Sequence, residues 1–185
     1  MNDFASPPRF GALTGSVSTE DATLTLQRLL PGPIERIWAY LVDSDLRRRW
    51  LAAGDMEPRV GAPFSLTWRN DELTTPPGTR PDGFGAEHTL QSRITAIDPP
   101  RHLAFEWGNT GGVTIDLAPE GDQVRLTLVH RRLPDRAMLL NVAAGWHAHL
   151  DILVARANDT THGPAPFWDH WAMLKAQYAE RIPAH

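Results

Sequence analysis

The order of the predicted elements indicates an α+β fold with an antiparallel sheet and a closing pair of helices. Two observations carry this prediction. Apolar residues alternate with period two in six runs, as in strands, and recur every three or four residues in three other stretches, as in helices. Most of the strand-like runs are joined by short connections, which favour antiparallel neighbours because parallel strands need a long crossover.

The first strand and helix lie on either side of a proline-rich turn. Thr23–Leu30 alternates between apolar and polar residues, as expected of a half-buried strand. Gly32 is the predicted N-cap of the next helix, with Pro33 in its first turn, where a missing N–H is tolerated. The helical region ends at Trp50, and the run Arg47–Arg49 is predicted to lie on its solvated side.

A meander of five further strands follows. These strands are predicted at Phe64–Trp68, His88–Ile97, His102–Trp107, Val113–Leu117 and Val124–Arg131. The stretch Asn70–Gly85 between the first two is rich in Pro and Gly and long for a compact domain, which makes it a candidate lid.

The period becomes helical again after the meander. Asp135–Asn158 carries an apolar stripe along one line and is predicted to be a core helix of about six turns. A second stripe runs over Phe167–Ile182, and this last helix is expected to pack on the outside.

Length and composition exclude several classes of protein. The 185 residues suit one domain, predicted at 22–185, preceded by an N-terminal arm at 1–21. The 18 Lys and Arg against 22 Asp and Glu argue against a nucleic-acid partner. The chain has no cysteine, so disulfides and thiolate nucleophiles are excluded. No apolar run reaches the length of a membrane span and no secretion signal is recognised, so no membrane association and a cytoplasmic location are expected.

Several motifs together resemble one known family. They are Arg28, PGPIERIW at Pro31–Trp38, Trp50, GWHAHLDIL at Gly145–Leu153 and PFW at Pro166–Trp168. From about Thr23 to Ile182 the sequence resembles the activator-of-heat-shock-protein-ninety-ATPase-homologue family, in its bacterial branch, within the START-like or SRPBCC superfamily that includes polyketide cyclases. The resemblance implies a helix-grip (START-like, Bet v-like) fold, in which a curved antiparallel sheet wraps a long C-terminal helix. Such proteins commonly hold an apolar or aromatic small molecule in a cavity.

Ten residues are the candidate ligand-binding set. Seven aromatic residues would supply contact area: Trp38, Trp50, Phe64, Trp68, Phe105, Trp107 and Trp146. His88 and His130 continue inward-facing rows at strand ends, are expected to be partly buried, and would supply polarity, while His149 could reach the cavity mouth. The alternative is that these side chains fill a core without a usable void.

Metal binding and covalent catalysis find little support. His147 and His149 lie two residues apart on a helix and so point about 200° apart, which prevents both from binding one ion. No metal site and no cofactor are therefore expected. An exposed ion pair between His147 and Asp151 is predicted. Arg28, directed where an apolar residue is expected, should pair with a carboxylate or backbone carbonyls or extend to the sheet edge, and this structural role is favoured over the binding of a ligand anion. The sequence contains no nucleophile elbow, P-loop or dinucleotide fingerprint.

Binding of a small hydrophobic or aromatic ligand is therefore the predicted function, with the oligomeric state open between monomer and homodimer. One alternative is an enzyme of cyclase, dehydratase or hydrolase type that uses an imidazole in the same pocket as general acid or base. A second is a chaperone-regulating or other protein-interaction module. No residue matches a chaperone-contacting motif, and no catalytic motif is recognised, so the prediction leans away from both.

Overall fold

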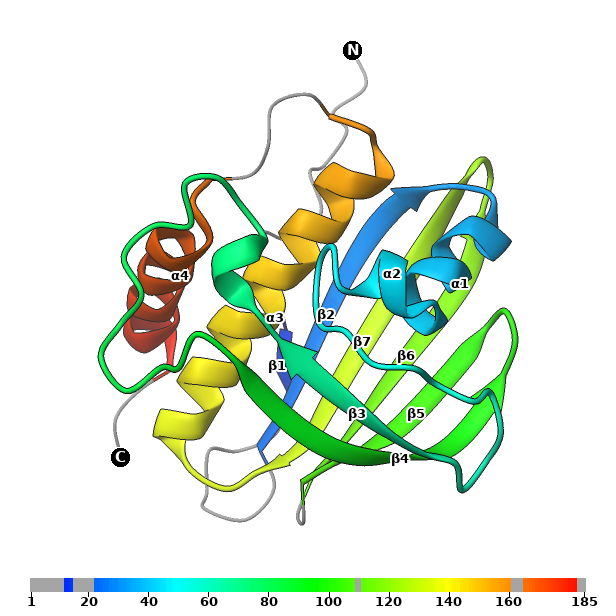
Figure 1. Ribbon diagram of the computed structural model, residues 1–185, viewed down its shortest axis with the longest axis horizontal. Helices are drawn as coiled ribbons and strands as arrows, with labels where there is room; N and C mark the ends of the chain where they lie inside the picture. Colours follow the sequence, from blue (N-terminus) through cyan, green and yellow to red (C-terminus); the bar gives the residue numbers. More distant parts are fainter. Residues whose placement is uncertain (1–11, 15–21, 109–110, 161–164, 183–185) are drawn as a thin grey trace.

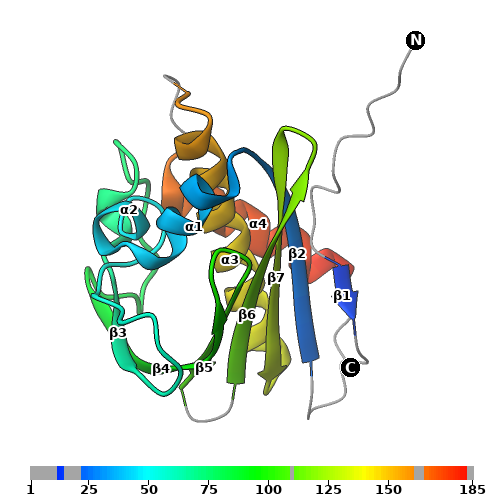
Figure 2. The same cartoon turned by 90° about the vertical axis from the view of Figure 1, so that its right-hand side faces the viewer.

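The computed structural model describes residues 12–14, 22–108, 111–160 and 165–182. Its sheet has seven antiparallel strands in the spatial order β1-β2-β7-β6-β5-β4-β3 (Figures 1 and 2). The strands are β1 (Ala12–Thr14), β2 (Ala22–Pro31), β3 (Pro63–Trp68), β4 (His88–Asp98), β5 (His102–Trp107), β6 (Gly111–Glu120) and β7 (Gln123–Leu133). The helices are α1 (Ile34–Val42), α2 (Ser44–Arg47), α3 (Arg136–Ala157) and α4 (Phe167–Arg181), with a 3-10 turn η1 at Asn70–Glu72. The α+β helix-grip prediction is confirmed.

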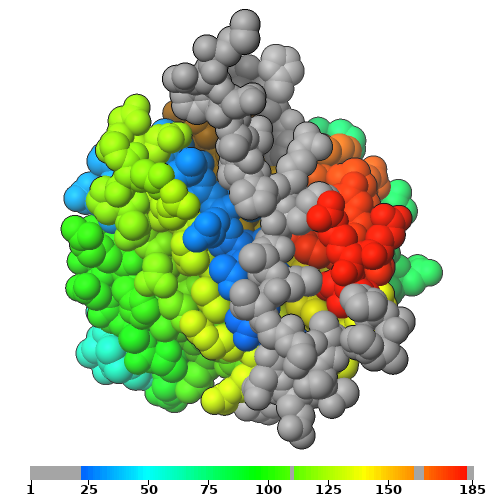
Figure 3. All heavy atoms as spheres, turned by 180° about the vertical axis from the view of Figure 1, so that it is seen from behind, coloured from blue at the N-terminus to red at the C-terminus, as the bar shows by residue number. Residues whose placement is uncertain are grey.

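The helices cover one face of a bent sheet. Alternate residues of β7 from Val124 to His130 are buried on that face, where α1 packs against β6 and β7, and α3 against β2 and β7. A register shift between Ile94 and Ala96 bends β4 as it passes β5. Figure 3 shows the outer side of the sheet from behind, where β2, β7 and β6 lie side by side in that order. The sheet therefore curves around the helical layer.

The long helix α3 lies in the core. Asp135 caps its start, because the Asp135 side chain accepts a hydrogen bond from the backbone N–H of Met138 at 2.7 Å. By length and composition this helix could cross a membrane, but 61% of its most apolar stretch is buried inside the fold. A buried core helix passes the same test, so the finding carries little weight for a membrane location. Outside α3 lies α4, as predicted for the last helix.

Several boundaries differ from the sequence-based expectation: α2 ends at Arg47 and not at Trp50, and β6 extends beyond Val113–Leu117 at both ends. The N-cap of α1 is Pro33 and the helix begins at Ile34, one residue later than predicted. The predicted N-terminal arm contributes a strand, β1, which pairs with β2 from Ala12 opposite Thr25 to Thr14 opposite Thr23. Three residues are too few to show a period, and the pairing with β2 defines this strand.

Arg47 is a correction to the predicted solvated arginine run. Its side chain is only 2% exposed, and its guanidinium donates to the carbonyls of Leu41, Val42 and Gly54. Two of these carbonyls belong to the last residues of α1, which have no partner within that helix. Burial lowers the pKa of Arg47 to about 10, against the opposing effect of nearby Asp43. Arg48 and Arg49 are exposed, as predicted.

Candidate functional site

A pocket of about 470 Å³ lies between α3, α4 and one end of the sheet. One wall comes from α3, through Met138, Asn141, Val142, Gly145, Trp146 and His149. The sheet supplies Trp68 from β3, His88 and Leu90 from β4, and Trp107 from β5. The opposite wall is formed by Phe167, Trp168 and Trp171 of α4, and Leu51, Asn70 and the segment Gly83–Glu87 complete the lining.

Aromatic rings form two groups around this pocket. On the sheet and α3, Trp107 lies between Trp68 and Trp146, with ring centroids 5.5 and 5.6 Å apart. On the other side, Phe84 contacts Trp168 and Trp171 at 5.3 and 5.1 Å. These separations are typical of packed aromatic pairs, so the rings of each group hold one another in place. The pocket separates two preformed aromatic surfaces.

The structure brings five of the ten predicted ligand-binding residues together at this pocket: Trp68, His88, Trp107, Trp146 and His149. Three others, Trp50, Phe64 and Phe105, line a separate void of only about 10 Å³. Trp38 is half-buried on α1 and packs against the core. His130 lies behind the pocket wall. Whether any of the ten contacts a ligand stays a prediction.

His130 supports two rings of the wall. Its Nδ1 accepts a hydrogen bond from the indole Nε1 of Trp146 at 3.1 Å, and its ring centroid lies 4.9 Å from that of Trp107. The side chain is buried, and burial lowers the pKa of His130 to about 4. His130 is therefore a neutral positioning residue for Trp146.

His88 has the opposite environment. It begins β4 at the pocket rim, is exposed, and stacks on Trp68 with ring centroids 5.8 Å apart. Partial burial was predicted for both His88 and His130. That prediction is wrong in opposite directions, because His88 starts its strand at the edge of the fold whereas His130 lies under Trp107 and Trp146.

His149 connects α3 to the segment after α2. Its Nδ1 donates a hydrogen bond to the carbonyl oxygen of Trp50 at 2.7 Å, and its ring lies 4.9 Å from that of Phe167. Burial lowers the pKa of His149 to about 4, although the bond to Trp50 opposes the shift. The imidazole is therefore neutral at neutral pH and fixed in orientation.

The polar groups of the pocket are few. Among the described residues, the Oδ1 atoms of Asn70 and Asn141 are buried and have no hydrogen-bond partner, and both residues belong to the lining. Glu87 is the one charged residue among the described lining residues, and it is paired with Arg69 at 2.7 Å. The interior is thus mainly aromatic, with isolated sites for hydrogen bonding.

The predicted lid is anchored to α4 along part of its length. The backbone N–H groups of Phe167 and Trp168 donate to Thr74 Oγ1 and the Pro77 carbonyl, each at 2.9 Å. Thr79 N–H donates to Asp169 at 2.9 Å. Beyond these anchors, Gly83–Glu87 borders the pocket and carries Phe84. Motion of Asn70–Gly85 as a lid stays a prediction.

Four of the pocket's aromatic residues were not predicted: Phe84, Phe167, Trp168 and Trp171. Two signals could have found them. The motif PFW marks the start of α4, and Phe84 stands between two glycines at the end of the long loop. The apolar stripe of α4 was instead interpreted only as packing against α3, because the position of the loop cannot be read from the period of a helix.

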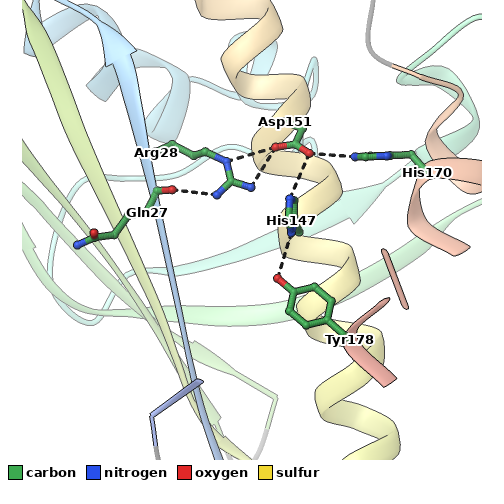
Figure 4. A network of polar contacts seen from close by, with 6 residues as sticks. All are labelled: Gln27, Arg28, His147, Asp151, His170 and Tyr178. Atoms are coloured by element: carbon green, nitrogen blue, oxygen red, sulfur yellow. Dashed lines mark hydrogen bonds and ion pairs between the residues drawn. The ribbon is translucent and has the colours of Figure 1, made fainter. Parts of the chain in front are cut away.

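A cluster of polar side chains lies on the side of α3 that faces away from the pocket, and Figure 4 shows its members. Asp151 accepts hydrogen bonds from Arg28 at 3.0 and 3.2 Å and from His170 at 2.9 Å, and it lies 3.4 Å from His147. The predicted pairing of Arg28 with a carboxylate is confirmed. His147 Nδ1 is 3.0 Å from the hydroxyl of Tyr178, which links α3 to α4.

His147 and Asp151 lie close together, as predicted, but the prediction that this pair is exposed is wrong. His147 is buried, and burial lowers its pKa to about 4 against the effect of Asp151. Burial also acts to raise the pKa of Asp151, but the hydrogen bond from His170 and the charge of Arg28 leave it below its ordinary value. His147 and His149 contact different parts of the protein, as their helical spacing predicts.

Comparison with protein families gives the same assignment as the motifs. Residues 31–158 match the model of the family "Activator of Hsp90 ATPase homolog 1-like protein". The chain belongs to this family. No curated protein matches it.

Solved structures of relatives support the fold. A Bordetella parapertussis protein, the product of BPP1335, is 36% identical with a TM-score of 0.73, over 95% of this chain and 94% of its own. CalU16 from Micromonospora echinospora is 20% identical with a TM-score of 0.67, over 94% and 98% of the two chains. An Enterococcus faecalis protein described as of unknown function is 18% identical with a TM-score of 0.68, over 93% and 90%. The last two likenesses concern the fold alone.

Proposed function

We propose that this protein binds a small, largely aromatic molecule in the pocket between α3, α4 and the sheet. One observation carries the proposal. Five of the seven tryptophans of the chain, together with Phe84 and Phe167, surround a single space of about 470 Å³. If these rings served only to fill a core, close packing would leave little room between them.

The size and composition of the pocket fit a small-molecule site. Ligand pockets usually measure about 300 to 1,000 Å³ and combine apolar or aromatic walls with a few polar groups. Apart from the indole N–H groups of its tryptophans, the lining residues with hydrogen-bonding side chains are Asn70, Glu87, His88, Asn141 and His149. The small number of these groups favours a ligand with an apolar body and few polar substituents.

The ring contacts also support binding without a large rearrangement. Trp107 is held between Trp68 and Trp146, and Trp146 is fixed by its hydrogen bond to His130. Trp168 is fixed by a bond from its Nε1 to Asp71 at 2.6 Å. Because these side chains are already ordered, a planar ligand inserted between them would cost little side-chain entropy.

A neutral polarity-sensitive dye tests the proposal directly. N-phenyl-1-naphthylamine should bind the folded protein with one-to-one stoichiometry and a micromolar Kd, gain fluorescence and quench tryptophan emission. Val142→Trp places a large side chain in the pocket and should weaken the dye at least about tenfold. Val60→Trp is the matched control, since Val60 is exposed and lies outside the lining, and its dye affinity should equal that of the unmodified protein.

Two results would refute the proposal. One is the absence of stoichiometric dye binding by the folded protein. The other is equal binding by Val142→Trp and Val60→Trp, which would place the dye elsewhere. Thermal unfolding of both variants shows whether Val142→Trp is folded, so loss of binding can be separated from loss of structure.

A further inference from the structure

His149 presents two chemically different nitrogens, and the structure assigns each of them. Nδ1 lies 2.7 Å from the carbonyl oxygen of Trp50. A carbonyl oxygen only accepts hydrogen bonds, so Nδ1 carries the proton. In a neutral imidazole the other nitrogen, Nε2, is then unprotonated and acts as an acceptor. Burial lowers the pKa of the ring to about 4, which keeps it in this neutral form at neutral pH.

The Nε2 atom is the nitrogen of His149 that is left for a ligand. Among the described residues it has no hydrogen-bond partner, yet it is not one of the fully enclosed unpaired polar atoms of the fold. It therefore keeps some solvent-accessible surface. Because His149 lines the pocket, we infer that this surface opens into the pocket. The result is a fixed acceptor in a wall that is otherwise mainly aromatic.

The charges around the pocket narrow the class of ligand further. No Lys or Arg belongs to the described lining, and its carboxylate, Glu87, is already paired with Arg69. The nearby cations are Arg69, which is paired with Glu87, and Lys175, which lies 5.0 Å from the ring centroid of Trp171. An anionic ligand would lose its hydration among the aromatic rings without gaining a Lys or Arg partner from the lining itself. An uncharged ligand with a hydrogen-bond donor would keep its apolar contacts and also satisfy Nε2.

We propose that His149 selects uncharged aromatic ligands that carry a hydroxyl or N–H group, by accepting a hydrogen bond from that group at Nε2. The inference rests on the proposed function and adds the chemical class of the ligand. It also gives His149 a role distinct from those of His88 at the rim and His130 behind the wall.

Three bicyclic probes separate the contributions of the aromatic ring system, the hydrogen-bond donor and the charge to the binding affinity. They are 2-naphthol, which has a donor, 2-methoxynaphthalene, which has the same ring system without one, and 2-naphthoate, which is an anion. Calorimetric titration at pH 7 should show 2-naphthol binding about fivefold more tightly than 2-methoxynaphthalene, as one net hydrogen bond implies. The naphthoate should bind more weakly than both.

The variant His149→Asn isolates the acceptor. Its side-chain amide can still donate to the Trp50 carbonyl from near the position of Nδ1, but it has no atom at the place of Nε2. We expect 2-naphthol to fall to the affinity of 2-methoxynaphthalene, which itself changes less than about twofold. Val142→Ala is the matched control, because it trims apolar wall and should weaken both probes equally, leaving their ratio intact.

Nitrogen NMR of the unmodified protein gives a readout that does not depend on the variant's folding. The ring of His149 should show a protonated Nδ1 and an unprotonated Nε2, and the Nε2 resonance should shift with 2-naphthol but not with 2-methoxynaphthalene. A protonated Nε2, equal affinities for the two probes, or a ratio that persists in His149→Asn overturns the inference and leaves the proposed function standing. If neither neutral probe binds, the proposed function fails and the inference fails with it.

Discussion

Replacing Asp151 by Asn should destabilise the fold because it leaves Arg28 without its counter-charge. The Oδ1 atom of Asp151 accepts from Nη2 and Nε of Arg28 at 3.0 and 3.2 Å, and its Oδ2 accepts from His170 at 2.9 Å. Asparagine keeps the shape of the side chain but removes the charge. It also cannot accept from all of these donors, since one oxygen is replaced by an amide nitrogen.

The exposures of the two side chains set the expected magnitude. Removing one partner of a fully buried ion pair costs about 3 to 5 kcal/mol, whereas an exposed pair contributes about 1 kcal/mol or less. The side chains of Arg28 and Asp151 are 10% and 31% exposed, which places the pair between these limits. We therefore expect Asp151→Asn to lower the free energy of unfolding by about 2 kcal/mol.

Urea unfolding, followed by tryptophan fluorescence, measures this change and the coupling. A double-mutant cycle with Arg28→Met should give a coupling free energy of about 1 to 2 kcal/mol between the two positions. Glu57→Gln is the control, because Glu57 pairs with Arg59 at 2.9 Å but both side chains are more than half exposed, and no measurable change is expected. The reasoning is refuted if Asp151→Asn costs no more than Glu57→Gln, or if the cycle shows no coupling.

Two further predictions concern buried titratable groups. His130, His147 and His149 have folded pKa values of about 4, below the ordinary 6.5, so the unfolded chain binds more protons between these values. The free energy of unfolding should therefore be highest above about pH 6.5 and fall as the pH decreases toward 4, by on the order of 3 kcal/mol at most per histidine; equal stability at pH 7.5 and 4.5 in urea titrations contradicts this. Arg47→Met should cost about 3 kcal/mol because it leaves three backbone carbonyls without their donor, whereas exposed Arg48→Ala should cost no more than about 0.5 kcal/mol. Similar losses in thermal or urea unfolding of the two variants would show that the buried guanidinium has no special role.

The fold could be predicted from the sequence because its strands and the helices α1 and α4 each bury one face. The alternation in β2 and β7 follows directly from that burial. The helix α3 is buried beyond its predicted stripe, for example at Leu140, His147 and Ile152, because it lies in the core. The family motifs added the wrapping of the sheet around α3. The short strand β1 could not be predicted in this way, since pairing with β2 and not a periodic pattern defines it.

The site could be predicted only in part, because a period assigns a side chain to a face and not to a neighbour. Trp68, Trp107 and Trp146 were found from their inward positions, but Trp50, Phe64 and Phe105 have equally inward positions and border a much smaller void. The two spaces differ in size because α4 and the Gly83–Glu87 segment border only the large pocket. The spacing of residues in the sequence does not show where these two parts of the chain lie. The same limit explains Arg47, whose direction depends on the carbonyls at the end of α1.

The two sides of α3 connect the pocket to the polar network. His149 faces the pocket, whereas His147, two residues earlier, faces α4 and contacts Tyr178. Since α4 supplies one wall of the pocket, the position of that wall depends on contacts that lie outside it. The bond from His170 to Asp151 fixes α4 one residue before Trp171, whose ring borders the pocket. Asp151 in turn binds Arg28 of β2, so the network holds the helix that forms the outer wall in register with both the core helix and the sheet.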